Sequence, residues 1–318
     1  MKEKFAIVAF NESSSKISEE ICLSNELKVY SKIPFNVDDH WKKWLGTIKV
    51  SAIENSNLVI YSSVPTTNPD ILDHEHKYVQ RRVFDFYYSL ALYGVPGYSE
   101  ANMITGTINE ENVSVREFSH LDYFYVVYNG KPKIINKMDI YRIFQIYKSL
   151  SLIYSDSNIK QNKYFRLRHG LNAYFKAITE RENYYRIPQL VRAIEAIIKP
   201  RIGKTKNDFA HRCKTFVVPN PDSETILLEI YELRNKVEHL HPLLEVYPTE
   251  SKDAALEIID SRVRKLEEIA RSVYTKLLLS SDLLGWFLDN SLIDKFWLLK
   301  DQEREKLWGS KLDLKTIN

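Results

Sequence analysis

The residues with the clearest chemical potential are Arg234, Asn235 and His239, which lie close together in one helical segment. A histidine suits proton transfer because its ordinary pKa lies near neutrality. An arginine suits a phosphate because its planar fork can bind two oxygens and stabilise developing negative charge. An asparagine can orient the imidazole or contact a phosphate oxygen. When the 2′-hydroxyl of RNA is the nucleophile, these groups suffice for phosphodiester cleavage without a metal, so we expect an endoribonuclease site.

The helix that carries this motif is predicted over residues 224–240. Asp222 or Ser223 can cap its first amide groups, and Pro242 ends it. Apolar side chains recur along it at helical spacing and form a narrow stripe, which predicts that one side of the helix faces a core. The members of the stripe are Ile226, Ile230, Leu233, Val237 and Leu240.

The rotation of the helix decides how the motif can be assembled. Because successive residues turn by about 100°, Asn235 and His239 face away from the apolar stripe, and Arg234 lies about 140° around the axis from His239. Two copies of the helix that face each other across a two-fold axis can bring a guanidinium to an imidazole. Leu228 and Tyr231 lie near the same outward side and can supply the apolar part of this contact. We therefore predict a homodimer through this helix.

Three segments, taken in order, resemble a HEPN domain of the ApeA-like branch: residues 187–195, 209–212 and 230–239. Arg234, Asn235 and His239 match the signature of that family, and the resemblance covers roughly residues 163–280. It implies a helical bundle that dimerises, metal-independent endoribonuclease activity, and a role in phage defence or a toxin-type stress response. His241 stands where a subgroup of HEPN toxins has a tyrosine that a partner nucleotidyltransferase modifies, so we do not expect that regulation.

The motif also has plainer interpretations. Arg234 and Glu238 have the spacing of an ordinary surface ion pair on a helix, and Asn235 and His239 can simply be solvated. A non-catalytic HEPN-like interaction module, which binds RNA or a partner protein through the same face, therefore stays open. So does a toxin whose activity is masked by an antitoxin or released by a trigger protein.

Basic residues around Gly203 form a second candidate feature. A flexible basic loop beside the motif can hold RNA phosphates, and an ordinary solvated loop between helices is an equally good interpretation. Glu195 lies among apolar residues, which predicts a buried partner in a supporting role, and Arg212 is the candidate for that partner. The expected RNA-binding residues are Lys199, Arg201, Lys204, Lys206 and Arg212.

We expect neither a metal nor a cofactor. The run Asp73-His74-Glu75-His76 is rich in ligand types, but His74 and His76 are two residues apart and fall on different sides of a helix. Acidic residues are also common in a first helical turn for electrostatic reasons. The chain has no glycine-rich phosphate loop and no nucleophile elbow of the Gly-x-Ser-x-Gly type.

The elements that position the motif change in character near residue 130. Before it, runs rich in Val, Ile, Tyr and Phe predict strands, with one long amphipathic helix. After it, long helical patterns with short connections predict an all-α, HEPN-like up-and-down bundle over residues 136–318, behind an α+β sensor or recognition domain over residues 1–135. The predicted strands are residues 5–10, 47–51, 58–61 and 113–128; the predicted helices are 71–93, 163–180, 188–198, 208–217, 224–240 and 253–279, with an apolar tail at 292–299.

The composition of the chain limits the class of protein to which it can belong. The 318 residues are 44% hydrophobic and 27% charged, which is ordinary for a globular protein with a sizeable core. Two cysteines provide no disulfide framework, and neither a signal peptide nor a membrane span is evident, so we expect a cytoplasmic protein with no membrane association. The net charge of +3 excludes a strongly basic coat and leaves room for a local RNA site. The identity of the RNA, the trigger and the ligand of the N-terminal domain is not encoded in any motif.

Overall fold

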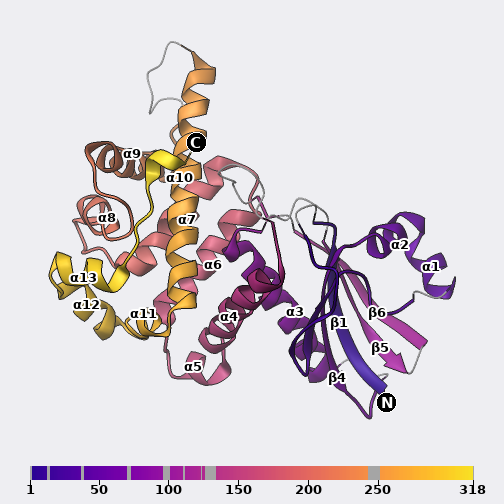
Figure 1. Cartoon of the computed structure of the whole chain (residues 1–318). Helices are drawn as coiled ribbons and strands as arrows, with labels where there is room; N and C mark the ends of the chain where they lie inside the picture. The colour runs from indigo at the N-terminus through magenta and orange to yellow at the C-terminus, as the bar shows by residue number, and fades with distance from the viewer. Residues whose placement is uncertain are drawn as a thin grey trace. The chain divides into compact units, whose positions relative to one another are not determined.

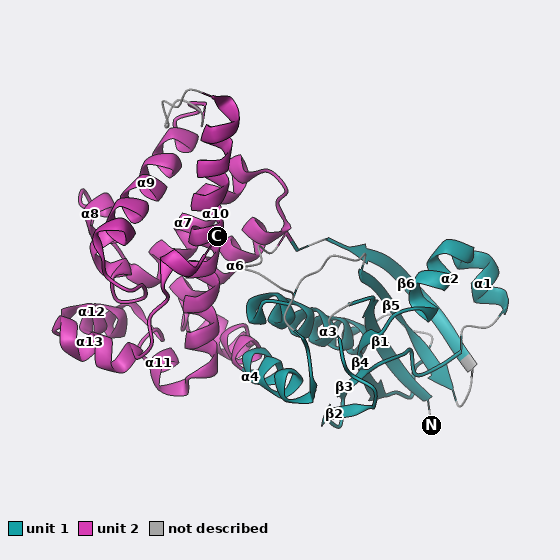
Figure 2. Cartoon of the chain, turned by 45° about the horizontal axis from the view of Figure 1, so that its top comes forward, with its two compact units in different colours: residues 1–124, 132–148 teal, residues 125–131, 149–318 magenta. Residues whose placement is uncertain are grey.

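The computed structural model divides the chain into two compact units (Figures 1 and 2). Unit 1 comprises residues 1–124 and 132–148, and unit 2 comprises residues 125–131 and 149–318. Helix α4 (Lys137–Ile153) begins in unit 1, and its last turn belongs to unit 2. The structure describes all residues except 1, 13–14, 37–38, 70–72, 96–100, 110–111, 123, 126–133, 243–250 and 318.

Unit 1 is built on a six-stranded antiparallel sheet with the order β2-β3-β4-β1-β5-β6. Strand β1 lies between β4 and β5, so residues 4–10 are all buried. A strand covered on both faces is apolar almost throughout, which is how residues 5–10 read in the sequence. The strands are β1 (Lys2–Phe10), β2 (Ile21–Ser24), β3 (Leu27–Tyr30), β4 (Leu58–Pro65), β5 (Ala101–Asn109) and β6 (Asn112–Leu121).

Helices cover both faces of this sheet (Figure 1). Helix α3 (His74–Tyr93) packs on β1 and β4, with Asp73 capping its start and Gly94, in the left-handed conformation, ending it. Helices α1 (Asp39–Leu45) and α2 (Thr47–Glu54) cover the opposite face. Strand residues alternate between the two sides, as the pleat requires, so neighbouring residues of β1 enter different cores.

One strand prediction in this unit was wrong, and three strands, β2, β3 and β5, were not predicted. Residues 47–51 form the start of α2, because Gly46, with φ 81°, separates the helix from α1, and Val50 and Ile53 then bury together at helical spacing. Strand β5 was not predicted, since its sequence is mostly small and polar. It nevertheless lies inside the sheet, paired with both β1 and β6, and a Cβ on Gly106 would lie only 2.2 Å from the backbone oxygen of Ser114. Part of the predicted strand over 113–128 and the start of the helix over 71–93 lie outside the described residues.

Unit 2 is helical, and the expected order of an α+β region followed by a helical region is confirmed. Helix α7 is the central element, since it packs against α6, α8, α9 and α10. It begins at Asn183, so Pro188 lies inside it and does not start it. The helices are α5 (Asp156–Lys160), α6 (Phe165–Thr179), α7 (Asn183–Ile198), α8 (Thr205–Cys213), α9 (Pro221–Glu238), α10 (Lys252–Leu279), α11 (Ser281–Gly285), α12 (Asn290–Leu298) and α13 (Asp301–Trp308), and a short 3-10 turn spans Leu314–Thr316.

Candidate functional site

The motif lies at the C-terminal end of α9. The helix starts earlier than predicted, because Asn220 is the capping residue and its Oδ1 accepts a hydrogen bond from the Ser223 amide at 2.9 Å. Pro221 occupies the first turn, where its missing amide hydrogen costs nothing. The prediction that Asp222 or Ser223 caps the helix was therefore wrong. The helix ends at Glu238, and His239 is the first residue beyond it.

The buried side of α9 differs from the predicted stripe at several places. Leu227, which was not part of the stripe, is fully buried, and Ile226 is only half-buried. Tyr231 was expected on the outward side, but it is only 3% exposed and its ring lies 5.5 Å from that of Phe209. Leu240 was expected in the core, but it is 82% exposed, because the chain turns into a left-handed conformation there, with φ 58°. Tyr231 is therefore unable to supply the apolar part of a dimer contact in this conformation.

Arg234 is held by groups of its own helix. Its Nη1 donates a hydrogen bond to Asn235 Oδ1 at 3.1 Å, and its guanidinium carbon lies 5.5 Å from the centre of the Tyr231 ring. The Arg234 Nε lies 3.7 Å from Glu238 Oε1, an ion-pair distance too long for a hydrogen bond. The side chain is 23% exposed, although its Nε is buried.

Helix α7 adds two charged residues to this cluster. Arg192 Nη2 donates to Glu238 Oε1 at 3.0 Å, so Glu238 has one arginine partner on each helix. Glu195 accepts a hydrogen bond from the Tyr231 hydroxyl at 3.4 Å. Burial raises the pKa of Glu195, and the nearby charge of Arg234 opposes that rise. The spacing of Arg234 and Glu238 was visible in the sequence, whereas nothing local indicated that Arg192 would join them.

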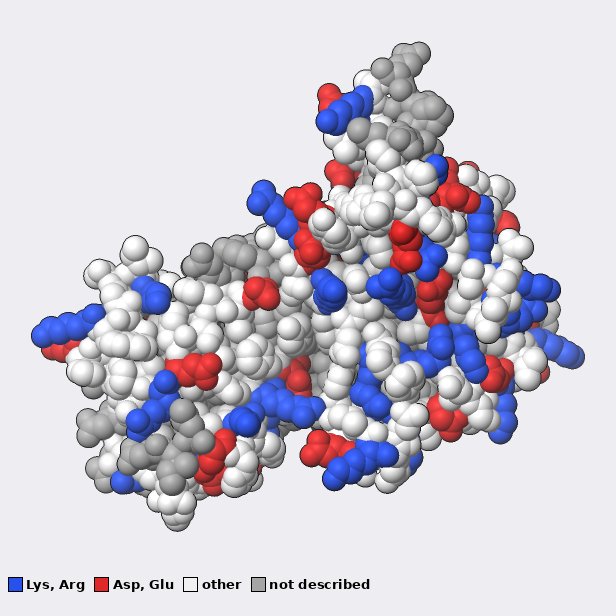
Figure 3. Space-filling view, turned by 180° about the vertical axis from the view of Figure 1, so that it is seen from behind, with Lys and Arg blue, Asp and Glu red and all other residues white. Residues whose placement is uncertain are grey.

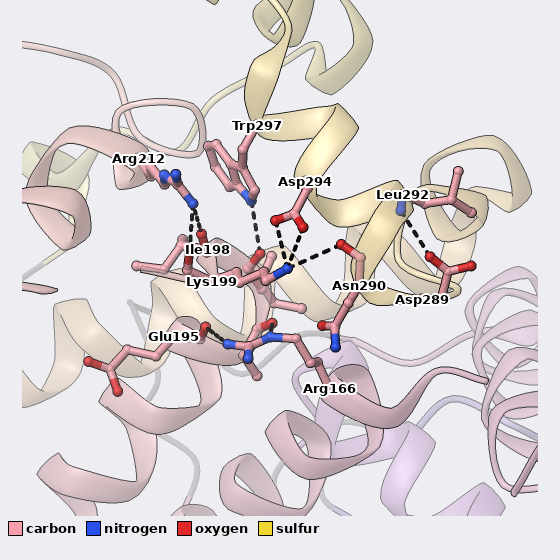
Figure 4. Close-up of polar contacts among 12 residues, drawn as sticks. Arg166, Glu195, Ile198, Lys199, Arg212, Asp289, Asn290, Leu292, Asp294 and Trp297 are labelled. Carbon is pink, nitrogen blue, oxygen red and sulfur yellow. Dashed lines mark hydrogen bonds and ion pairs between the residues drawn. The ribbon is translucent and has the colours of Figure 1, made fainter. Parts of the chain in front are cut away.

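Arg212 is not the partner of Glu195, contrary to expectation. It binds the exposed carbonyl groups at the end of α7, which the last turn of a helix leaves without partners inside the helix (Figure 4). Side chains from three other helices together satisfy five successive carbonyls. Arg166 donates to those of Glu195 and Ala196, Trp297 to that of Ile197, and Arg212 to those of Ile198 and Lys199. This anchoring fixes the turn of α7 that presents Glu195.

The basic loop after α7 is largely neutralised by ion pairs. Lys199 Nζ lies 2.6 Å from Asp294 Oδ1 (Figure 4), and Arg201 Nη2 lies 2.6 Å from Asp208 Oδ1. The hydrogen bond from Arg201 lowers the pKa of Asp208 to about 2. Lys206 pairs with Glu232. Basic and acidic side chains are likewise interspersed over the face shown in Figure 3.

Lys204 differs from the other basic residues of this loop. It is exposed, and within the part of the chain that the structure describes it makes no ion pair. It is therefore the residue of the loop whose charge is most available to an RNA phosphate.

A groove of about 440 Å³ opens beside the end of α9. Its walls come from α6, α7 and the last turn of α9. The Tyr184 hydroxyl of α7 donates a hydrogen bond to the Val237 carbonyl of α9 at 3.1 Å and so connects the two helices. Tyr185 is 60% exposed and its ring meets that of Tyr184 edge-on. The charged and amide side chains of the groove are Lys176, Glu180, Gln189, Arg192 and Glu238.

His239 is exposed and stands apart from the charged cluster. Its backbone amide donates to the Asn235 carbonyl at 3.0 Å, which keeps the chain helical to that point. Among the described residues, its imidazole has no hydrogen-bond or ion-pair partner. The structure thus brings Arg234 and Asn235 together with Glu238, whereas the His239 imidazole contacts none of the three among the described residues.

Neither unit holds a recognisable metal site among its described residues: no three His, Cys, Asp or Glu side chains are grouped closely enough to bind an ion. Asp73 and Glu75 instead bind the buried Lys4, whose Nζ lies 2.7 Å and 3.0 Å from their carboxylate oxygens. No described helix combines the length and the apolarity that crossing a membrane requires.

Comparison of the chain with protein-family models, with curated proteins and with solved structures found no match. By its fold, the chain is an antiparallel α+β unit joined to a helical unit. Its candidate site is a charged cluster at the end of α9, followed by the exposed His239; of the cluster, Glu238 and Arg192 line the groove. Function has to be argued from that site.

Proposed function

We propose that the chain is a metal-independent endoribonuclease whose active site is formed by Arg234, Asn235 and His239. One observation carries the proposal: the exposed His239 and the partly exposed Arg234 lie at the end of one helix, whose neighbouring residues Glu238 and Leu240 line a groove with a tyrosine wall. Aromatic faces stack on unpaired bases of any sequence, which suits a single-stranded substrate. The resemblance of the motif to the HEPN signature points to the same chemistry.

The ion pairs of the cluster allow Arg234 to bind a phosphate. Its contact with Glu238 is long, and its Nε, which is buried, makes no hydrogen bond among the described residues. When the guanidinium turns to a phosphate, Glu238 keeps its hydrogen bond with Arg192, so no carboxylate is left without a partner. Arg234 would then stabilise the charge that develops on the phosphorane, with Asn235 orienting it.

His239 supplies the proton transfers in this proposal. One imidazole removes the proton of the 2′-hydroxyl, which attacks the adjacent phosphorus, and the bond to the 5′-oxygen breaks as that oxygen receives a proton. Each chain offers one such imidazole, so a homodimer through α9 would provide both a base and an acid. The products would be a 2′,3′-cyclic phosphate and a 5′-hydroxyl. A role in phage defence or a toxin-type response, with a trigger protein or antitoxin as regulator, belongs to the same proposal.

The test is cleavage of total tRNA and of single-stranded RNA in the presence of EDTA. Wild type should cut, and His239→Ala should reduce the rate by about 10²–10⁴-fold, the usual contribution of a general acid or base. His211→Ala, which removes another exposed histidine of unit 2, should leave the rate unchanged. Equal rates for wild type and His239→Ala, or cleavage that EDTA abolishes, would refute the assignment.

A non-catalytic interaction module is the second candidate. It is favoured by the internal ion pairs of Lys199, Arg201 and Lys206, which leave little free positive charge to attract RNA. In that case His239→Ala would bind a protein partner as wild type does, and neither would cut any substrate.

A further inference from the structure

A second pocket, of about 470 Å³, lies in unit 1 and is lined by residues of α2 and of the paired strands β5 and β6. Its volume falls within the range of small-molecule sites, about 300–1,000 Å³. The start of α2 forms one wall, and cross-strand partners of β5 and β6 form the floor. The lining residues are chiefly Thr47, Ile48, Lys49, Ala52, Asn102 and His120.

The ionisable side chains that line this pocket are basic. Among the described residues that line it, the ionisable side chains are Lys49 and His120, and no carboxylate is present. Phe118 positions both: the Lys49 Nζ lies 4.6 Å from the centre of its ring, and the His120 ring meets it edge-on at 5.2 Å. Asn102, directly opposite His120 in the strand register, is 1% exposed and adds an amide to the floor. Such a lining favours an anionic group.

The first turn of α2 lines the same pocket and strengthens this preference. Gly46 precedes the helix with φ 81°, and no side chain in the described part of the chain caps the first amide groups of the helix. Uncapped amides at a helix start carry partial positive charge and bind anions. The helix start therefore acts together with Lys49 and His120.

The rim of the pocket is apolar. Ile48 lines it and is 86% exposed, and Leu45 and Ala52 contribute further apolar surface. An aliphatic side chain this exposed gains free energy when an apolar surface covers it. The occupant should therefore combine an anionic group with an apolar body.

We propose that this pocket binds a small molecule that carries one phosphate or carboxylate group on an apolar or planar body. Lys49, His120 and the start of α2 bind the anionic group, and Ile48 contacts the body. Unit 1 therefore binds a ligand at a site separate from the Arg234 cluster of unit 2. This site does not depend on ribonuclease activity, because every residue that forms it belongs to unit 1.

Isothermal titration calorimetry on the full chain tests the proposal with two matched probe pairs. Adenosine 5′-monophosphate is compared with adenosine, and indole-3-acetate with indole-3-acetamide; inorganic phosphate serves as an anion without a body. At least one anionic probe should bind about tenfold more tightly than its neutral partner, the usual effect of one charge-assisted hydrogen bond. A preference for adenosine 5′-monophosphate over adenosine would indicate a phosphate ligand. A preference for indole-3-acetate over indole-3-acetamide would indicate a carboxylate ligand.

Variants assign the binding to the pocket. Lys49→Gln and His120→Ala should each weaken the anionic probe by about tenfold. Lys43→Gln, which removes an exposed lysine of α1 outside the pocket, should have no effect. Ile48→Ser alters an exposed side chain, so the fold is retained, and it should weaken the organic anion while leaving inorganic phosphate unchanged.

Three results would overturn the proposal. The first is that no anionic probe binds below about 1 mM. The second is that Lys43→Gln weakens binding as much as Lys49→Gln, which would indicate general attraction to positive charge. The third is that inorganic phosphate binds as tightly as the organic anions, which would remove the role of the apolar rim.

Discussion

Replacing Arg186 by methionine should strongly destabilise unit 2, because it leaves a buried carboxylate without its arginine. Arg186 of α7 is 5% exposed and pairs with Glu267 of α10, which is 1% exposed. Breaking a buried pair on one side costs about 3–5 kcal/mol. For a unit of this size each kcal/mol lowers the melting temperature by about 2–4 °C, so we expect a decrease of roughly 10 °C.

Far-ultraviolet circular dichroism during thermal unfolding measures this change, since unit 2 is helical. The double variant with Glu267→Leu should recover much of the loss, because an apolar pair of similar volume can replace a buried ion pair at little cost. Arg181→Met, which alters an exposed arginine just before α7, should stay within about 0.5 kcal/mol of wild type. A shift below about 2 °C for Arg186→Met, or a double variant no more stable than the single one, would refute the reasoning.

Three further predictions concern other parts of the chain. Burial lowers the pKa of His76, so the unfolded chain binds that proton more readily. The stability of wild type relative to His76→Leu should therefore fall as the pH drops below about 6.5, and unfolding in urea across pH measures it. Gly106→Ala should lower the unfolding free energy by about 2 kcal/mol or more, since the new methyl group would overlap the Ser114 carbonyl. Glu238→Gln should raise RNA affinity about two- to fivefold by releasing Arg234, as measured by fluorescence anisotropy in the His239→Ala background.

Each of these predictions has a matched control. His76→Leu should flatten the pH dependence, although Lys4, Asp73, Arg116 and Glu117 remain around the site; an unchanged slope would exclude His76 as its cause. Gly285→Ala has open space around the new methyl group and should be tolerated, so equal losses would contradict the steric argument. Glu224→Gln, near the other end of α9, should not change RNA affinity. An equal gain there would mean that only net charge matters.

The extent of α9 was largely predictable from nearby residues, whereas its burial pattern was not. A predicted helix over residues 224–240 corresponds to α9 because apolar spacing and a following proline act within a few residues. The burial of Tyr231 against Phe209 was not predictable in the same way, since it depends on where α8 packs. Tertiary packing also explains why residues 47–51 form a helix and not a strand. As a helix, this segment buries Val50 and Ile53 against the sheet, and a local pattern does not reveal that contact.

The sequence by itself determined the order of an α+β region and a helical region, the position of Arg234, Asn235 and His239 at one helix end, and the absence of any strong net charge. Those properties follow from short-range periodicity and composition. Only the tertiary structure decided that Arg192 joins Arg234 on Glu238, and that Arg212 caps α7 and does not bind Glu195. The ion-pair partner of a charged side chain depends on which distant helices pack together. A long side chain can reach several neighbours, so its partner is defined only once the backbone has packed.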